Sequence, residues 1–262
     1  MRLLRLSTYL SLSLLALVLI IYRLQSEPIT PDWSTPVELH IYPVNADQRL
    51  ETAEYLASLT HDSFADIEAF FAKSASVYNV SLVHPIRVRL MPVVDQLPPR
   101  VPVEPSIVQS MFWGLRMRLW VSANDQFDVD ENTIRVFMNY YAPSSSGGNQ
   151  HSLGLQKGRI GLVNGFAGSH LQGVNNVVAV HEALHTLGAL DRYDSETAEP
   201  LWPDGYADPY KEPLFPQHRA EIMGGRIQII PGYAVLSPSL SFANMGDLTA
   251  REIGWLKRPR DL

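Results

Sequence analysis

Two histidines lie four residues apart around a glutamate in the stretch VAVHEALHTLGALD, residues 178–191, and a glycine and an aspartate follow them. On a helix, residues four apart are separated by about 40° around the axis, so His181 and His185 can both reach one metal ion. Glu182 lies about 60° from His185, where it can address a water molecule on that ion without binding the metal. This spacing predicts a zinc site with two imidazole ligands and a general base.

A third protein ligand is expected after the second histidine. Gly188 can end the helix with a left-handed turn, after which the chain can bend back so that Asp191 reaches the metal. Asp194 lies close by in the sequence, and Glu221 follows at a larger separation. Asp191 is therefore the first candidate for the third ligand, and Asp194 and Glu221 remain alternatives.

The histidine motif lies in the second half of a predicted helix that directly follows a predicted strand. Val174, Val177 and Val178 continue the apolar face of that helix, so the helix should pack against a sheet and keep the site dry. Apolar residues at period two predict strands, and apolar residues at helical spacing predict an earlier helix. The predicted strands are 37–44, 86–93, 115–121, 133–141 and 159–166, and the predicted helices are 47–76 and 173–187. This order predicts an α/β or α+β fold.

The composition fits one domain of the size of an enzyme. A chain of 262 residues with 46% hydrophobic residues can bury one good-sized core. The net charge of -6 comes without basic clusters, which argues against nucleic acid as a partner. Because the chain has no cysteine, any metal site must use histidine, aspartate or glutamate. The composition leaves the oligomeric state open.

An uncharged apolar segment occupies residues 6–22 and follows Arg2 and Arg5, which is typical of a membrane-inserting helix. No cleavage site of the A-x-A kind follows it, so we expect an uncleaved signal anchor rather than a signal peptide. Arg2 and Arg5 would stay in the cytoplasm, which predicts a membrane-anchored protein whose catalytic domain is periplasmic or extracellular. If the segment were cleaved, the protein would be secreted.

The motif His181-Glu182-x-x-His185-x-x-Gly188-x-x-Asp191 resembles the zinc motif of metzincin-type metallopeptidases, in the variant of snapalysin-like enzymes with aspartate in place of the third histidine. The resemblance implies a metzincin-like zincin fold. Such a fold has a twisted, mostly parallel five-stranded sheet, an active-site helix that binds zinc, and a smaller C-terminal subdomain. It also implies that His181, His185 and Asp191 bind Zn2+ and that Glu182 is the catalytic residue.

The domain boundaries follow from this resemblance and from the proline content. We expect an N-terminal anchor or signal segment at 1–27, a proline-rich linker at 28–36, and a catalytic domain at 37–258 with an upper subdomain at 37–188 and a lower one at 189–258.

Metzincin-type enzymes have a methionine-containing turn beneath the metal, and Met223 in the segment 220–225 is the corresponding residue of this chain. Packing in the core is the alternative role for Met223. The segment 245–256 resembles the closing helix of these enzymes. Some subfamilies have a tyrosine two residues after the methionine, where this chain has Gly225. The tyrosines that remain unassigned candidates to assist catalysis are Tyr193, Tyr206 and Tyr233.

These observations predict a zinc-dependent metalloendopeptidase that hydrolyses a peptide or protein substrate, with Glu182 as the base that activates water. The alternative is a non-catalytic, metal-stabilised domain that binds a partner in the cell envelope. Glu182 argues against this alternative, because a structural metal site needs no base. An intramembrane protease is a third hypothesis, but the motif lies far from the apolar segment 6–22 and is followed by the charged residues Asp191 and Arg192.

Overall fold

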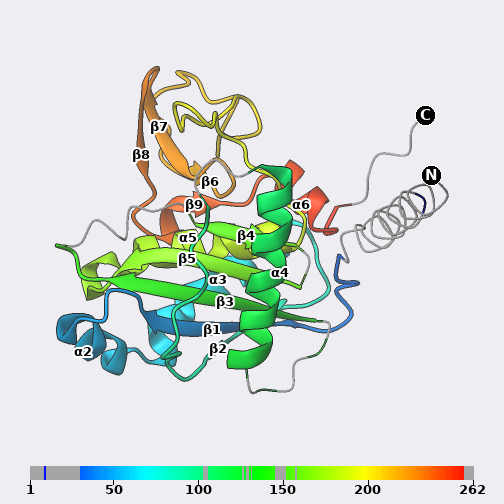
Figure 1. Ribbon diagram of the computed structural model, residues 1–262. Coiled ribbons are helices and arrows are strands. Elements are labelled where there is room, and N and C mark those ends of the chain that lie inside the picture. The colour runs from blue at the N-terminus through cyan, green and yellow to red at the C-terminus, as the bar shows by residue number, and fades with distance from the viewer. Residues whose placement is uncertain are drawn as a thin grey trace.

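The computed structural model describes Tyr9 and residues 30–102, 106–125, 127, 130, 132–144, 152–156 and 158–256. Within this part of the chain, five strands form one sheet in the order β2-β1-β3-β5-β4 (Figure 1). They are β1 (Val37–Asn45), β2 (Ile86–Leu90), β3 (Thr133–Tyr141), β4 (Leu153–Leu155) and β5 (Ile160–Phe166). The first, second, third and fifth strands pair in parallel, whereas β4 runs antiparallel to β5 at one edge. The chain therefore has the mixed α/β architecture that the order of elements predicted and the mostly parallel sheet that the resemblance implied.

The remaining elements are helices and short strands. The α-helices are α2 (Leu50–Ser58), α3 (Ala65–Val77), α4 (Ile107–Asn124), α5 (Gln172–Thr186) and α6 (Asp247–Glu252), and the 3-10 turns are η1 (His61–Phe64), η3 (Ser169–Leu171) and η4 (Leu240–Phe242). After α5, β6 (Ala220–Glu221) pairs with β9 (Ala243–Asn244), and β7 (Arg226–Ile230) pairs with β8 (Tyr233–Leu236). Helix α6 is shorter than the closing helix predicted at 245–256.

Helices cover both faces of the sheet, because the central strands are apolar on both sides. In β1, Leu39 and Ile41 point into one core, and Tyr42 and Val44 point into the other. Side chains of α3 and α5 complete the first core, and those of α4 complete the second. Figure 1 shows α4 crossing in front of the sheet. Parallel strands buried on both faces require this three-layer arrangement.

The predicted strands at 37–44, 133–141 and 159–166 are confirmed as β1, β3 and β5, and the predicted helix at 173–187 is confirmed as α5. The strand predicted at 86–93 ends as β2 at Leu90. All of these segments are long apolar or amphipathic runs bounded by polar or turn residues. Such runs are the elements that sequence periodicity predicts best.

The single helix predicted at 47–76 is wrong, because the chain is divided there into α2, η1 and α3. Leu59 and Thr60 are extended, and Thr60 begins the next turn. The Ser63 hydroxyl accepts a hydrogen bond from the Thr60 N–H at 3.1 Å. The Ser63 N–H donates in turn to the Thr60 carbonyl at 3.0 Å. This local pairing competes with continuation of the helix, although the apolar spacing runs through it.

The strand predicted at 115–121 is wrong, because this segment lies inside α4. Its alternating residues would all share one face of a strand. In the structure, Met117 and Val121 are buried, whereas Leu115 and Leu119 are exposed. Only helical spacing separates these four side chains in this way. The fifth strand of the sheet is instead β4, which the sequence analysis missed.

No helix in the described part of the chain is long and apolar enough to cross a membrane. The prediction of a transmembrane helix acting as signal anchor is corrected accordingly. Of the segment 6–22 to which that prediction referred, only Tyr9 belongs to the described residues.

In the predicted linker, Trp33 is buried, and its indole N–H donates to the carbonyl of Ile253 at 2.7 Å.

The two alternating leucines and their buried neighbours provide a test of the helical assignment. Met117→Ala should lower the free energy of unfolding by about 2–4 kcal/mol, because it empties a fully buried position in the second core. Leu119→Ala should change it by less than about 0.5 kcal/mol, because Leu119 is exposed. Urea unfolding of both variants measures the difference. Similar losses in the two variants would contradict the helix and favour a strand.

Candidate metal centre

Helix α5 carries the predicted ligands, and polar side chains fix its first half. The side-chain oxygen of Gln172 accepts hydrogen bonds from the hydroxyls of Tyr55 at 2.6 Å and Tyr140 at 3.2 Å. The side-chain NH2 group of Gln172 donates to Asn176 Oδ1 at 2.7 Å, and that of Asn176 donates to Asp66 Oδ1 at 2.6 Å. These bonds join α5 to α2, α3 and β3. The histidines further along the helix are therefore held in a fixed direction relative to the sheet.

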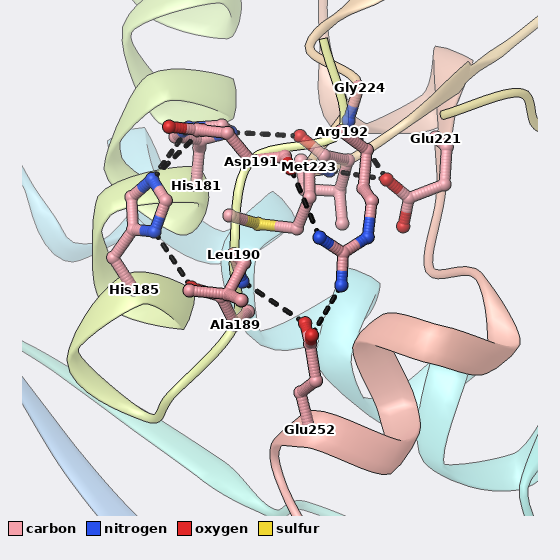
Figure 2. A network of polar contacts seen from close by, with 11 residues as sticks. His181, His185, Ala189, Leu190, Asp191, Arg192, Glu221, Met223, Gly224 and Glu252 are labelled. Carbon is pink, nitrogen blue, oxygen red and sulfur yellow. Dashed lines mark hydrogen bonds and ion pairs between the residues drawn. The ribbon is translucent and has the colours of Figure 1, made fainter. Parts of the chain in front are cut away.

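The helix ends at the glycine that the sequence analysis selected. Gly188 has a φ of 109°, a conformation that costs glycine little, and its N–H donates to the carbonyl of His185 at 3.1 Å. The chain then turns back, and Asp191 comes to lie beside His181 and His185 (Figure 2).

Three side-chain atoms meet at the centre of this arrangement. His181 Nε2 lies 3.1 Å from Asp191 Oδ1 and 3.1 Å from His185 Nε2. The third side, from His185 Nε2 to Asp191 Oδ1, is also 3.1 Å. Donor atoms bound tetrahedrally to one zinc ion lie roughly 3.3 Å apart. The triangle is therefore close to the size that three zinc ligands require.

The orientation of both imidazoles is set by main-chain carbonyls. His181 Nδ1 lies 3.0 Å from the carbonyl oxygen of Ile222, and His185 Nδ1 lies 2.8 Å from that of Ala189. A carbonyl oxygen only accepts, so each Nδ1 carries the proton and each Nε2 of a neutral ring offers a lone pair. Three acceptors then face one another at 3.1 Å, and a bound cation would satisfy all of them. Two nitrogens and a carboxylate oxygen are a donor set that suits zinc.

The electrostatic interactions within the triangle favour the charged forms of both Asp191 and His181. Burial alone would raise the pKa of Asp191, but the Nε2 atoms of His181 and His185, which donate to its carboxylate when they carry a proton, hold this pKa well below its usual value. Burial alone would lower the pKa of His181, but the Asp191 and Glu182 carboxylates raise it above its usual value. Asp191 is therefore ionised, as a ligand must be, and a proton competes with a metal for His181.

Glu182 is buried beside the two histidines and turned toward strand β4. Its Oε2 atom has no hydrogen-bond partner among the described residues. Burial raises the pKa of Glu182, although His181 and His185 lower it. A Cβ atom at Gly154 in β4 would lie 2.5 Å from His185 Cβ and 3.3 Å from Glu182 Oε2. Only glycine therefore allows β4 to approach the helix this closely, a contact that the sequence analysis did not anticipate.

The two alternative third ligands have other roles. Asp194 Oδ1 accepts hydrogen bonds from the N–H groups of Glu196 at 2.9 Å and Thr197 at 2.8 Å, so it stabilises its own turn. Both oxygens of the buried Glu221 accept hydrogen bonds. Its four donors are the N–H groups of Met223 at 2.6 Å, Gly224 at 2.9 Å and Gly246 at 2.9 Å and the hydroxyl of Thr249 at 2.8 Å. Among the described residues, the geometry therefore favours Asp191 as the third ligand.

The three unassigned tyrosines have different surroundings in the structure. The ring of Tyr193 lies 6.2 Å from that of His181. Tyr206 packs 6.3 Å from Phe215, and Tyr233 is exposed on the hairpin of β7 and β8. Burial and the neighbouring Asp191 carboxylate raise the pKa of Tyr193 to about 12, so its phenol keeps its proton near neutral pH. Tyr193 is therefore the tyrosine that can act at this centre.

Met223 is fully buried, and the turn that contains it faces the loop carrying Asp191 (Figure 2). Its carbonyl accepts a hydrogen bond from the Arg192 N–H at 3.0 Å. The main chain of this turn therefore supports the loop that carries Asp191. The Met223 side chain belongs to the first core, which agrees with its alternative role in packing.

A clamp from the last helix holds the loop around Asp191, and the sequence analysis missed it. Glu252 in α6 accepts a hydrogen bond from the Leu190 N–H at 3.0 Å and forms an ion pair with the Arg192 guanidinium (Figure 2). Arg192 also donates to the carbonyl of Asp191 at 3.1 Å. Glu252 thus fixes the residues on both sides of Asp191.

Neither a protein-family model nor a curated protein matches this chain. The resemblance of the zinc motif to that of metzincin-type enzymes therefore remains a prediction.

A substitution series tests the third ligand. Asp191→Ala should weaken zinc binding by about 10²-fold or more, because it removes one of three protein ligands. Asp194→Ala should leave zinc affinity unchanged, because that carboxylate bonds only to its own turn. Competition with a chromophoric chelator measures both affinities. A larger loss in Asp194→Ala than in Asp191→Ala would reverse the assignment.

The clamp is tested by Glu252→Ala. Loss of its two contacts should loosen the loop around Asp191 and weaken zinc binding by about tenfold, the range found for outer-shell groups. Stability should fall by about 2 kcal/mol, because Arg192 loses its partner. Glu196→Ala, which removes an exposed carboxylate, is the matched control. If both variants bind zinc equally well, Glu252 has no role in positioning the ligand.

Proposed function

We propose that this chain is a zinc-dependent metalloendopeptidase. The proposal depends on one observation, the triangle of His181, His185 and Asp191 with the buried Glu182 carboxylate beside it. A structural metal site needs only its ligands, and a buried carboxylate oxygen without a hydrogen bond is costly. The presence of such a group next to the ligands supports a reaction in which Glu182 takes up a proton.

Zinc at this centre would supply a Lewis acid that polarises a scissile carbonyl and acidifies a water molecule. Glu182 takes the proton from that water and delivers it to the leaving amine. Because burial raises the pKa of Glu182, its protonated form between these two transfers is less costly than for an exposed glutamate. Tyr193, whose phenol remains protonated, can donate a hydrogen bond to the oxygen on which negative charge develops.

The outer edge of β4, with which no other described strand pairs, supports a peptide as the substrate. In the described sheet, β4 pairs with β5 on one side and ends the sheet on the other. An extended peptide can hydrogen-bond to such an edge as an added strand. Since Gly154 in β4 packs against α5 at Glu182 and His185, a peptide added there would pass beside the proposed base.

Glu182→Gln separates catalysis from metal binding. The amide keeps the size of the side chain but cannot accept the proton, so hydrolysis of a mixed peptide library should fall by about 10²-fold or more. Zinc content should stay near one ion per chain, because Glu182 is not one of the three converging residues. Asp194→Asn, the same chemical change at a nearby exposed turn, should keep full activity.

Two outcomes would count against the proposal in different ways. Full activity in Glu182→Gln would contradict the role of this residue as the base. A parent protein that binds zinc but cleaves no peptide in the library would favour the non-catalytic, metal-stabilised binding domain.

Tyr193→Phe removes only the phenolic hydroxyl. We expect kcat to fall by about 10²- to 10³-fold with little change in zinc affinity, as for other single donors to a developing negative charge. Tyr233→Phe, on the exposed hairpin, should behave like the parent protein. Steady-state kinetics with a cleaved library peptide make the comparison, and equal kcat values in the two variants would exclude Tyr193 from the reaction.

A further inference from the structure

Helix α4 exposes large apolar side chains on the face that points away from the sheet. These residues, which we call the α4 stripe, are Val108, Met111, Phe112, Leu115 and Leu119, with exposed fractions of 60%, 40%, 65%, 51% and 64%. The opposite face of the same helix is buried in the second core through Trp113, Met117 and Val121. The helix is therefore apolar on both faces, although only one of them packs into a core of the described residues. Contiguous exposed apolar surface of this kind marks an interaction site.

The charges of α4 follow the borders of the stripe. At about 100° per residue, the five apolar side chains fall within an arc of about 100°. Arg118 projects at one border of this arc and Arg116 at the other. No aspartate or glutamate occurs between Ile107 and Asn124. An apolar stripe edged on both sides by guanidinium groups can insert into acyl chains while the arginines reach the headgroup level.

We propose that the α4 stripe binds a lipid surface with anionic headgroups, with α4 lying in the plane of that surface. The proposal is independent of the proposed peptidase activity and concerns residues other than the segment 6–22. An 18-residue helix is about 27 Å long, so the whole stripe can lie in the interface at once. The net charge of -6 opposes general attraction of the chain to an anionic surface. Binding therefore has to be local and oriented by α4.

The chemistry of the stripe fits lipid better than protein. Protein interfaces carry about one hydrogen bond per 100–200 Å², whereas the only exposed hydrogen-bonding side chain within this arc is that of Ser122. A second copy of the chain fits less well. Two copies of this face would place Arg116 of each copy against a helix that contains no aspartate or glutamate.

The absence of cysteine allows a site-specific test in the full chain. Leu115→Cys and Val83→Cys are each labelled with an environment-sensitive fluorophore. Val83 is exposed but lies outside α4, so it is the matched control. With vesicles of phosphatidylcholine and phosphatidylserine, we expect a blue shift and quenching by brominated acyl chains for the label at 115 only. Vesicles of phosphatidylcholine alone should give a smaller response.

Unlabelled variants measure the energetic contribution of the face. The double substitution Phe112→Gln/Leu115→Gln should weaken partitioning into anionic vesicles by about tenfold or more, because two large apolar groups no longer insert. Arg116→Gln should weaken it by about fivefold. Leu50→Gln/Val83→Gln, at two exposed apolar positions outside α4, should have no effect. Circular dichroism and zinc content should be unchanged in every variant, because these side chains lie outside both cores.

Three results would overturn the proposal. The first is failure of the parent protein to sediment with anionic vesicles. The second is sedimentation with vesicles while the label at 115 shows neither a blue shift nor quenching, which would assign binding to another part of the chain. The third is a blue shift of that label in the absence of vesicles, together with a dimer in sedimentation velocity. That result would make a second copy of the chain the occupant of the α4 stripe.

Discussion

Mutual repulsion among three acceptor atoms is the constraint on which the arrangement of the centre depends. The lone pairs of two imidazoles and one carboxylate converge within 3.1 Å, and such a group is stable only around a cation or a shared proton. Several separate segments must hold their positions to keep these atoms together. The carbonyls of Ala189 and Ile222 orient the two rings, so the end of α5 and the turn after β6 are as necessary as the ligands themselves.

A second buried carboxylate organises the segment that supplies one of these carbonyls. Glu221 lies next to Ile222 and gathers four donors from the turn after β6, from the segment before α6 and from α6 itself. Burial raises the pKa of Glu221, whereas the four hydrogen bonds act in the opposite direction and lower it. Glu252 then joins the same helix to the loop around Asp191. The C-terminal elements thus act on the candidate metal centre through two carboxylates, neither of which belongs to the triangle of His181, His185 and Asp191.

The sheet separates this centre from the surface formed by α4. Helices α3 and α5 pack on one face, and α4 packs on the other through Trp113, Met117 and Val121. The outer face of α4 belongs to neither core of the described residues, so the proposed contact with lipid would not compete with packing. Reaction chemistry at α5 and lipid binding at α4 would use opposite layers of one fold, which is why each can be altered without disturbing the other.

The sequence by itself determined the local features of this protein. Histidines four apart share one side of a helix turn, Gly188 ends that helix, and apolar runs form β1, β3 and β5, because each depends on neighbours within a few residues. Only the tertiary structure favours Asp191 over Asp194 and Glu221 as the candidate third ligand. That choice depended on which carboxylate was already occupied by N–H donors, and half of the donors to Glu221 come from segments distant in sequence. The segment LRMRLWV, residues 115–121, also needed the tertiary structure. Its alternation predicts a strand, and only packing against the sheet, which buries Met117 and leaves Leu115 in solvent, shows that it is helical.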